Sequence, residues 1–126
     1  MDAEGRFSIS AQALYSRLGT ELAPIVVDVR RSPAFEADDT VIAGALRRLP
    51  AEVDDWRREL PEGRSVVVYC AHGQEVSQNA ATTLRAAGTD AGFLEHGVTG
   101  WAELRLPRRR KLAAGSDGWV TRERPK

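Results

Sequence analysis

The feature that most constrains this chain is a short apolar run ending in its only cysteine. Residues 66–69 (Val-Val-Val-Tyr) are too few and too β-branched for a helix, and they predict a buried strand of a parallel sheet. Cys70 follows directly, where an open α/β sheet places its ligand crevice, beyond the carboxyl end of a strand. A loop with Gly73 leads into a helical pattern with apolar residues on one face, at Ala80, Ala81, Leu84 and Ala87.

Strand and helix patterns alternate along the rest of the chain. Ser10 is a good N-cap for a helix over residues 11–18, and residues 25–29 predict a second buried strand. Pro50 opens a helix with Val53, Trp56 and Leu60 on one face, and residues 92–94 predict another strand. The alternation predicts an α/β domain in which helices cover both faces of a parallel sheet.

Other segments carry weaker patterns. Residues 30–44 are polar and predict a long loop with one helical turn at 34–37, after which residues 44–46 start a short strand. Gly97 and Gly100 are expected to flank a turn into a last amphipathic segment around Trp101.

Composition excludes several classes of protein. The 126 residues suit one domain, and 18 basic against 18 acidic residues argue against nucleic-acid or membrane-surface binding. A single cysteine excludes an internal disulfide and a multi-cysteine zinc site, and two distant histidines argue against a metal. We therefore expect no metal and no cofactor. The chain shows neither a signal-peptide pattern nor an apolar run of membrane-spanning length, so we expect a cytoplasmic protein with a reduced thiol.

The position of Cys70 favours a functional thiol over an inert core residue. A cysteine that only fills the core is expected within the apolar run, not at its end before a polar loop. The backbone amides of the loop Ala71, His72, Gly73, Gln74, Glu75 and Val76 can curl around one centre and bind an anion. The following helix dipole adds to this, and both would stabilise a thiolate or a persulfide anion.

Three segments together resemble the rhodanese family of single-domain sulfurtransferases. They are Val27–Arg30 (Val-Asp-Val-Arg), Val67–Cys70 with a glycine three residues later, and Leu94–Trp101. The resemblance covers residues 8 to about 106. It implies a rhodanese-like fold with about five parallel strands, and a ping-pong reaction in which Cys70 carries sulfane sulfur within a cradle of amides from the loop. Thiosulfate, 3-mercaptopyruvate or a protein persulfide would donate the sulfur, and cyanide, a thiol or a carrier protein would accept it.

The chain departs from the family at Glu75, where rhodaneses often carry an arginine. A carboxylate facing the pocket would repel thiosulfate, so either Glu75 points outward or the donor is not a simple dianion. The lack of a clamping arginine also argues against phosphate-ester or arsenate chemistry at this loop.

Three charged or polar residues around the thiol have two interpretations each. His72 either donates to the oxygens of a donor or is a solvated loop residue. Asp28, at a strand end, orients Arg30 or a loop amide, or makes a structural hydrogen bond. Arg30 is either a cation at the mouth of the pocket or a surface residue.

The character of the chain changes after Pro107. Residues 1–107 are assigned to the domain, and residues 108–126 to a basic linker or tail that could dock an acidic partner. The closing residues 119–126 resemble the start of a chromate-resistance domain, which would make the tail a remnant or the start of a following domain.

Two functions from different classes follow from these observations. The first is a sulfurtransferase with Cys70 as the persulfide carrier. The second is a non-catalytic rhodanese-like interaction or redox-sensing module, which the carboxylate of Glu75 and the basic tail favour.

Overall fold

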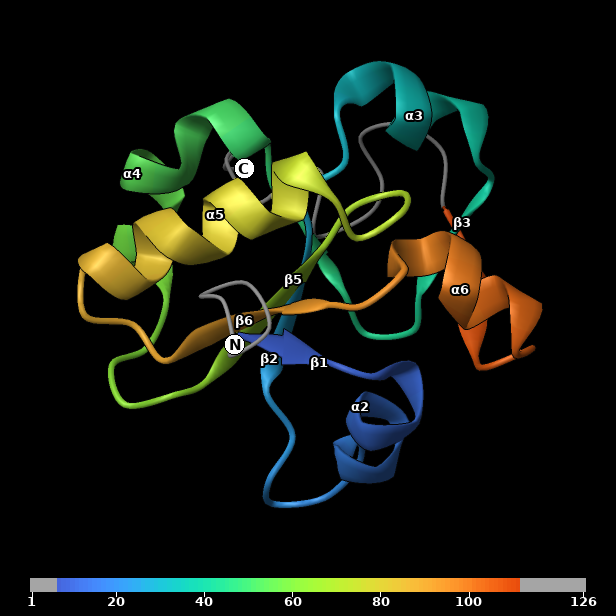
Figure 1. The fold of residues 1–126 in the computed structure, drawn as a ribbon, viewed down its shortest axis with the longest axis horizontal. Coiled ribbons are helices and arrows are strands. Elements are labelled where there is room, and N and C mark those ends of the chain that lie inside the picture. The colour runs from blue at the N-terminus through green and yellow to red at the C-terminus, as the bar shows by residue number, and fades with distance from the viewer. Residues whose placement is uncertain (1–6, 112–126) are drawn as a thin grey trace, which may run out of the picture.

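The computed structural model describes residues 7–111. Its centre is a five-stranded sheet in the order β1-β6-β5-β2-β4, in which every neighbouring pair is parallel (Figure 1). The strands are β1 (Ser8–Ile9), β2 (Ile25–Asp28), β4 (Leu46–Arg47), β5 (Val66–Tyr69) and β6 (Ala91–Leu94). The predicted five-stranded parallel α/β fold is confirmed, with the cysteine strand β5 at the middle of the sheet.

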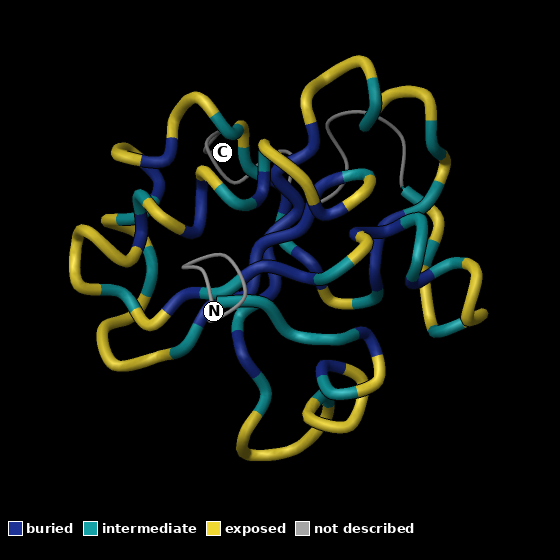
Figure 2. Tube along the Cα trace, viewed as in Figure 1, coloured by how far each residue is buried: buried dark blue, intermediate teal, exposed yellow. Residues whose placement is uncertain are grey.

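Helices cover both faces of the sheet, as the sequence predicts. Helices α4 (Val53–Trp56) and α5 (Glu75–Ala86) pack on one face, and α2 (Ala11–Arg17) and α6 (Gly97–Glu103) on the other. Successive residues of β5 belong to opposite cores, Val66 and Val68 to the first and Val67 and Tyr69 to the second. Figure 2 shows the result as buried chain along the central strands and exposed chain around the rim. Burial on both faces explains why the strands are apolar without alternation.

The helix ends agree with the local signals. Ser10 caps α2, because its Oγ accepts the amide of Ala13 at 3.1 Å. Helix α5 begins at Glu75, one residue before the expected start at Val76. The helix expected after Pro50 is instead three short pieces, η1 (Pro50–Glu52), α4 and η2 (Arg57–Glu59), in which several amides bond the carbonyl three residues back.

Two sequence predictions need correction. Residues 30–44 are not one loop with a single turn, because they form helix α3 (Ser32–Ala37) and strand β3 (Thr40–Ile42). Gly97 and Gly100 do not flank a turn but lie within α6. Both glycines permit a close approach, since a Cβ at Gly100 would lie 2.6 Å from Cβ of His96.

The first residues of the basic run after Pro107 form a strand, not a linker. Residues Arg108–Arg110 form β7, which pairs antiparallel with β3 through Thr40 opposite Arg110 and Ile42 opposite Arg108. The indole of Trp101 donates to the Pro107 carbonyl at 2.8 Å and so fixes the entry to this strand. The run was misread because three identical charged residues show no alternation between faces. Residues 112–126, and with them the resemblance to a chromate-resistance domain, lie outside the described residues.

Candidate active site

Cys70 lies at the base of a pocket at the carboxyl edge of the sheet. It is the first residue after β5, is 6% exposed, and belongs to a pocket of about 230 Å³. The pocket contains every predicted loop residue except Gly73; its lining residues are Arg30, Arg31, Ala34, Cys70, Ala71, His72, Gln74, Glu75 and Val76. The thiol is thus buried, yet it borders an open cavity rather than hydrocarbon on all sides.

Two backbone amides of helix α6 bind the start of the loop at Cys70 and Ala71. The amides of Val98 and Thr99 donate to the carbonyls of Cys70 and Ala71, both at 3.0 Å. Within residues 7–111, the amides of Ala71 to Glu75 donate to no protein acceptor. The loop therefore directs two carbonyls into α6, while the amides of Ala71 to Glu75 have no acceptor within residues 7–111.

Two glycines let this loop and the β6–α6 turn meet backbone to backbone. Gly73 has a φ of +72°, and a Cβ there would lie 2.5 Å from the amide nitrogen of His96. Gly97 has a φ of +58°, and a Cβ there would meet the carbonyl of Cys70 and the backbone of Ala71. Both positions need glycine, because φ is positive and because a Cβ would have no room. The β6–α6 turn therefore restricts the conformation of the loop after Cys70.

Sequence reasoning missed Ser77, whose side chain is hydrogen-bonded to the thiol. The Cys70 thiol donates to Ser77 Oγ at 3.1 Å, and Ser77 Oγ lies 3.5 Å from the Gln74 carbonyl. Ser77 is fully buried, and its hydroxyl can turn to donate to the sulfur when the sulfur is an anion. The signal was present: Ser77 occupies the first position of the apolar stripe that continues at Ala80, Ala81 and Leu84. A hydroxyl in such a stripe needs a partner.

Replacing Ser77 with alanine is expected to slow alkylation of Cys70 by iodoacetamide at constant pH by about tenfold. The reason is the loss of a hydrogen bond to an anionic sulfur. Ser16→Ala is the matched control, because that hydroxyl is exposed and bonds only the carbonyl of Ala13. Equal alkylation rates in wild type and Ser77→Ala would show that the hydroxyl does not stabilise the thiolate.

Polar loop side chains form the rim of the pocket. His72, Gln74 and Glu75 are all exposed. Glu75 is the first residue of α5, where a carboxylate is favourable to the helix dipole, and it is an exposed residue of the pocket lining. His72 is in the position of a solvated loop residue; its side chain makes no hydrogen bond within the described part of the chain.

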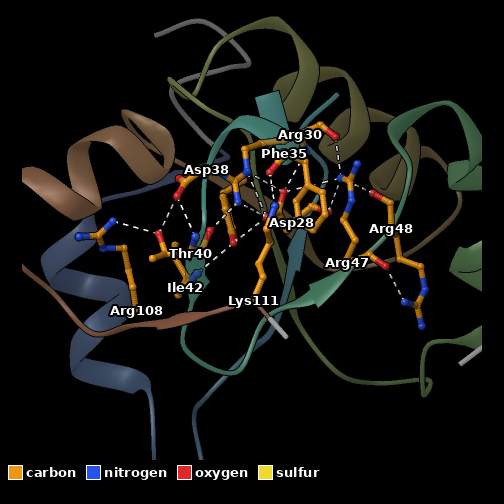
Figure 3. Close-up of polar contacts among 11 residues, drawn as sticks. Asp28, Arg30, Phe35, Asp38, Thr40, Ile42, Arg47, Arg48, Arg108 and Lys111 are labelled. Atoms are coloured by element: carbon orange, nitrogen blue, oxygen red, sulfur yellow. Dashed lines mark hydrogen bonds and ion pairs between the residues drawn. The ribbon is translucent and has the colours of Figure 1, made fainter. Parts of the chain in front are cut away.

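Asp28 and Arg30 form a buried ion pair behind the pocket (Figure 3). Asp28 is fully buried and accepts from the amide and the guanidinium of Arg30, at 2.8–3.2 Å, and from the hydroxyl of Tyr69 at 2.9 Å. Arg30 also donates to Asp38 at 2.8 Å and to the carbonyl of Thr40 at 3.0 Å. Both interpretations of Asp28 fit these contacts, since it holds Arg30 and also accepts a buried structural hydrogen bond from Tyr69. Arg30 is not a surface residue. Arg30 lines the pocket, but its guanidinium is already bound to Asp28, to Asp38 and to the Thr40 carbonyl.

A second arginine and an aromatic ring complete this cluster. The Arg47 guanidinium lies 4.2 Å from the ring centre of Phe35 and donates to the carbonyl of Arg30 at 2.6 Å. On the other side, the ammonium of Lys111 lies 4.0 Å from the same ring centre and donates to the carbonyl of Phe35. The cluster joins β2, α3, β4 and the end of β7, and it fixes the segment that leads to Arg31.

The environment fixes the charge states in this cluster. Burial alone would lower the pKa of Arg30, but its hydrogen bonds and attraction to Asp28 outweigh burial and raise the pKa of Arg30 above its ordinary value. Burial lowers the pKa of Arg47, and attraction to Asp28 offsets this only in part. Burial, with Asp28 nearby, raises the pKa of Tyr69 well above its ordinary value, so the phenol stays a donor.

Comparison with known proteins agrees with this geometry. Residues 10–104 match the family model of the rhodanese-like domain. The chain belongs to the rhodanese-like domain family. No curated protein matches the chain.

Several solved structures resemble this rhodanese-like domain. A rhodanese-related protein from Thermoplasma volcanium is 29% identical with a TM-score of 0.72, covering 82% of this chain and 98% of that one. A rhodanese-like domain protein from Staphylococcus aureus is 26% identical with a TM-score of 0.65, covering 75% and 89%. A thiosulfate sulfurtransferase from Pseudomonas aeruginosa is 21% identical with a TM-score of 0.71; the match covers 84% of this chain but 20% of that one, and shows the fold alone.

In the described part of this rhodanese-like domain, no helix is long and apolar enough to cross a membrane. No group of three or more His, Cys, Asp or Glu side chains in residues 7–111 is arranged to hold a metal ion.

Proposed function

We propose that this rhodanese-like domain is a sulfurtransferase that carries sulfane sulfur on Cys70 as a persulfide. The observation that supports the proposal is the surroundings of one sulfur atom. Cys70 lines an open pocket, its Sγ lies 3.1 Å from a buried hydroxyl, and the loop that follows has amides with no acceptor in the described residues. These groups stabilise an anion at the sulfur, which both a thiolate nucleophile and a bound persulfide require.

The reaction divides into two steps that leave the protein unchanged. In the first, Cys70 thiolate attacks the outer sulfur of a donor such as thiosulfate. An Sγ–S bond forms, the S–S bond of the donor breaks, and sulfite leaves with the electron pair. In the second, an acceptor thiolate or cyanide attacks the outer sulfur and the electron pair returns to Sγ. The amides of Ala71 to Glu75 would hold the negative outer sulfur between the steps.

Intact-mass measurement tests the proposal directly. After incubation with thiosulfate, 3-mercaptopyruvate or polysulfide, the wild-type mass is expected to rise by one sulfur atom and to return on addition of cyanide. Cys70→Ser is expected to show no increase. A wild-type protein that gains no sulfur from any of the three donors would contradict the proposal.

One observation favours the second candidate, a non-catalytic interaction or redox-sensing module. The carboxylate of Glu75 lies at the mouth of the pocket, where it opposes entry of a dianion. A sensing module would form a mixed disulfide or a sulfenic acid at Cys70 under oxidation, without passing sulfur to an acceptor.

Replacing Glu75 with glutamine is expected to raise kcat/KM for thiosulfate by about fivefold at low salt. The exposed carboxylate acts only through solvent, so the effect is modest and should fall as salt is added. The control is Glu103→Gln, an exposed acid on α6 outside this pocket. An unchanged kcat/KM in Glu75→Gln across salt concentrations would show that this charge does not limit donor entry.

A further inference from the structure

The pocket of Cys70 is not isolated, because a second pocket adjoins it. The second has a volume of about 330 Å³ and lies between α5 and the η1–α4 segment. Both pockets are lined by Arg31 and Val76, so these two side chains form the shared boundary. Thiosulfate has only five heavy atoms. Joined, the two pockets fall within the range of ~300–1,000 Å³ that is typical of sites for larger organic ligands.

Arg31 is the uncommitted cation at this boundary. It is exposed, and its guanidinium makes no hydrogen bond or ion pair with any residue in 7–111. Its neighbour Arg30 is only 2% exposed and is bound to Asp28 and Asp38. The planar guanidinium of Arg31 can therefore bind a carboxylate through two parallel hydrogen bonds.

The second pocket has walls suited to a peptide. One side of α5 lines it at helical spacing, through Val76, Asn79, Ala80 and Thr83. Asn79 offers both a donor and an acceptor, and Thr83 offers a hydroxyl, which together match the two polar groups of a peptide bond. Among its described lining residues the pocket has one acid, Asp54, which is 79% exposed and already paired with Arg57.

We propose that the two pockets bind a short peptidic thiol with a carboxylate close to the sulfur, and that Arg31 binds this carboxylate. The inference rests on the sulfurtransferase function proposed above and names the class of acceptor. The thiolate of the peptide attacks the outer sulfur of the Cys70 persulfide. A bond forms between these two sulfurs, the bond from the outer sulfur to Cys70 Sγ breaks, and its electron pair stays on Sγ. The peptide leaves as a persulfide, and the peptide backbone lies along Asn79 and Thr83 during transfer.

The test compares acceptors after Cys70 has been loaded with polysulfide. The acceptors are N-acetyl-alanyl-cysteine, the same dipeptide as its C-terminal amide, and 2-mercaptoethanol. Sulfur transfer is followed by intact mass. The acid is expected to have a kcat/KM at least about tenfold above the amide, since a charge-assisted bidentate contact is lost in the amide. In Arg31→Ala this ratio should fall to near one, because the acid loses the contact that the amide never makes.

Two further variants separate a subsite from a general effect. Thr83→Phe fills the second pocket and is expected to raise KM for the dipeptide by a larger factor than KM for 2-mercaptoethanol. Arg17→Ala removes an exposed arginine on α2, outside both pockets, and should change nothing. Equal use of the acid and the amide by wild type, or an unchanged ratio in Arg31→Ala, would overturn the subsite.

A binding measurement keeps the two proposals distinct. The S-methyl form of the dipeptide acid cannot react, and its binding to Cys70→Ser can be measured by calorimetry. Binding that is lost in the Cys70→Ser, Arg31→Ala double variant supports the subsite even if Cys70 never accepts sulfur. If Cys70 accepts sulfur but the dipeptide does not bind, the sulfurtransferase proposal stands and the proposed subsite is overturned.

Discussion

Replacing Gly97 with alanine is expected to lower the free energy of unfolding by about 3–5 kcal/mol and to slow sulfur loading of Cys70 at least about tenfold. A Cβ at this position would meet the backbone of Cys70 and Ala71, not a flexible side chain that could turn away. The amides of Val98 and Thr99 bond the same two carbonyls at 3.0 Å. The turn can make room only by breaking these bonds and shifting the loop that carries the thiol.

The control for this prediction separates backbone strain from the close contact. Gly44 has a similar positive φ of +85°, but a Cβ there would have no neighbour within 4 Å. Gly44→Ala is expected to cost only the conformational strain, about 1–2 kcal/mol. Urea denaturation of both variants gives the comparison, and loading of Cys70 is followed by intact mass. If Gly97→Ala and Gly44→Ala lower the free energy of unfolding equally, the close approach of the turn to the loop contributes nothing to stability.

Replacing Asp28 with alanine is expected to cost about 3–5 kcal/mol of stability, because it leaves a buried cation without its main partner. Arg30 is 2% exposed and would keep only Asp38 as an ion-pair partner, while the hydroxyl of Tyr69 would lose its acceptor. The loss of a negative charge also leaves Arg30 and Arg47 repelling each other across the cluster.

Asp28→Asn and a surface pair supply the comparison for this second prediction. Asparagine keeps the shape and the acceptor oxygen but not the charge, so its loss of stability should be smaller than that of Asp28→Ala. Asp54→Ala removes the exposed pair with Arg57 at 3.3 Å and is expected to change stability little. Chemical denaturation measures all three. An Asp28→Ala protein as stable as Asp54→Ala would mean that the buried cluster contributes little net stability.

The central strands and the position of the thiol could be predicted because their signals are local. A parallel strand buried on both faces is expected to be continuously apolar, which holds for Val66–Tyr69 and for β2 up to its last residue, Asp28. Where such a strand ends, a polar loop and then a helix follow, so the place of Cys70 in the fold follows from the pattern alone. The loop predicted over residues 71–76 is shorter in the structure, because Glu75 and Val76 already belong to α5.

The segments that were misread depend on partners far away in the chain. Helix α3 buries none of its residues, and it is held through Phe35 by Arg47 and Lys111, which no local pattern could reveal. Strand β3 pairs with Arg108–Arg110, more than 60 residues later in the chain. The sequence pattern of that segment had indicated a linker. Ser77 was visible as a polar residue in an apolar stripe, but only the folded chain shows that its partner is the thiol.

The sequence by itself determined the central strands β2 and β5, the helix α5 and the thiol at a strand end, because burial and backbone geometry act over a few neighbouring residues. The tertiary structure alone decided the roles of Arg30 and Arg31, which are adjacent and chemically identical. One is buried against Asp28, and the other lies exposed between two pockets. The carboxylates that bind Arg30 are near it in the chain, at Asp28 and Asp38. The Tyr69 ring beside its guanidinium, and the α5 residues that line the pockets next to Arg31, come from distant segments. Charge and solvation at a site depend on such distant contacts, which the local pattern of a sequence does not contain.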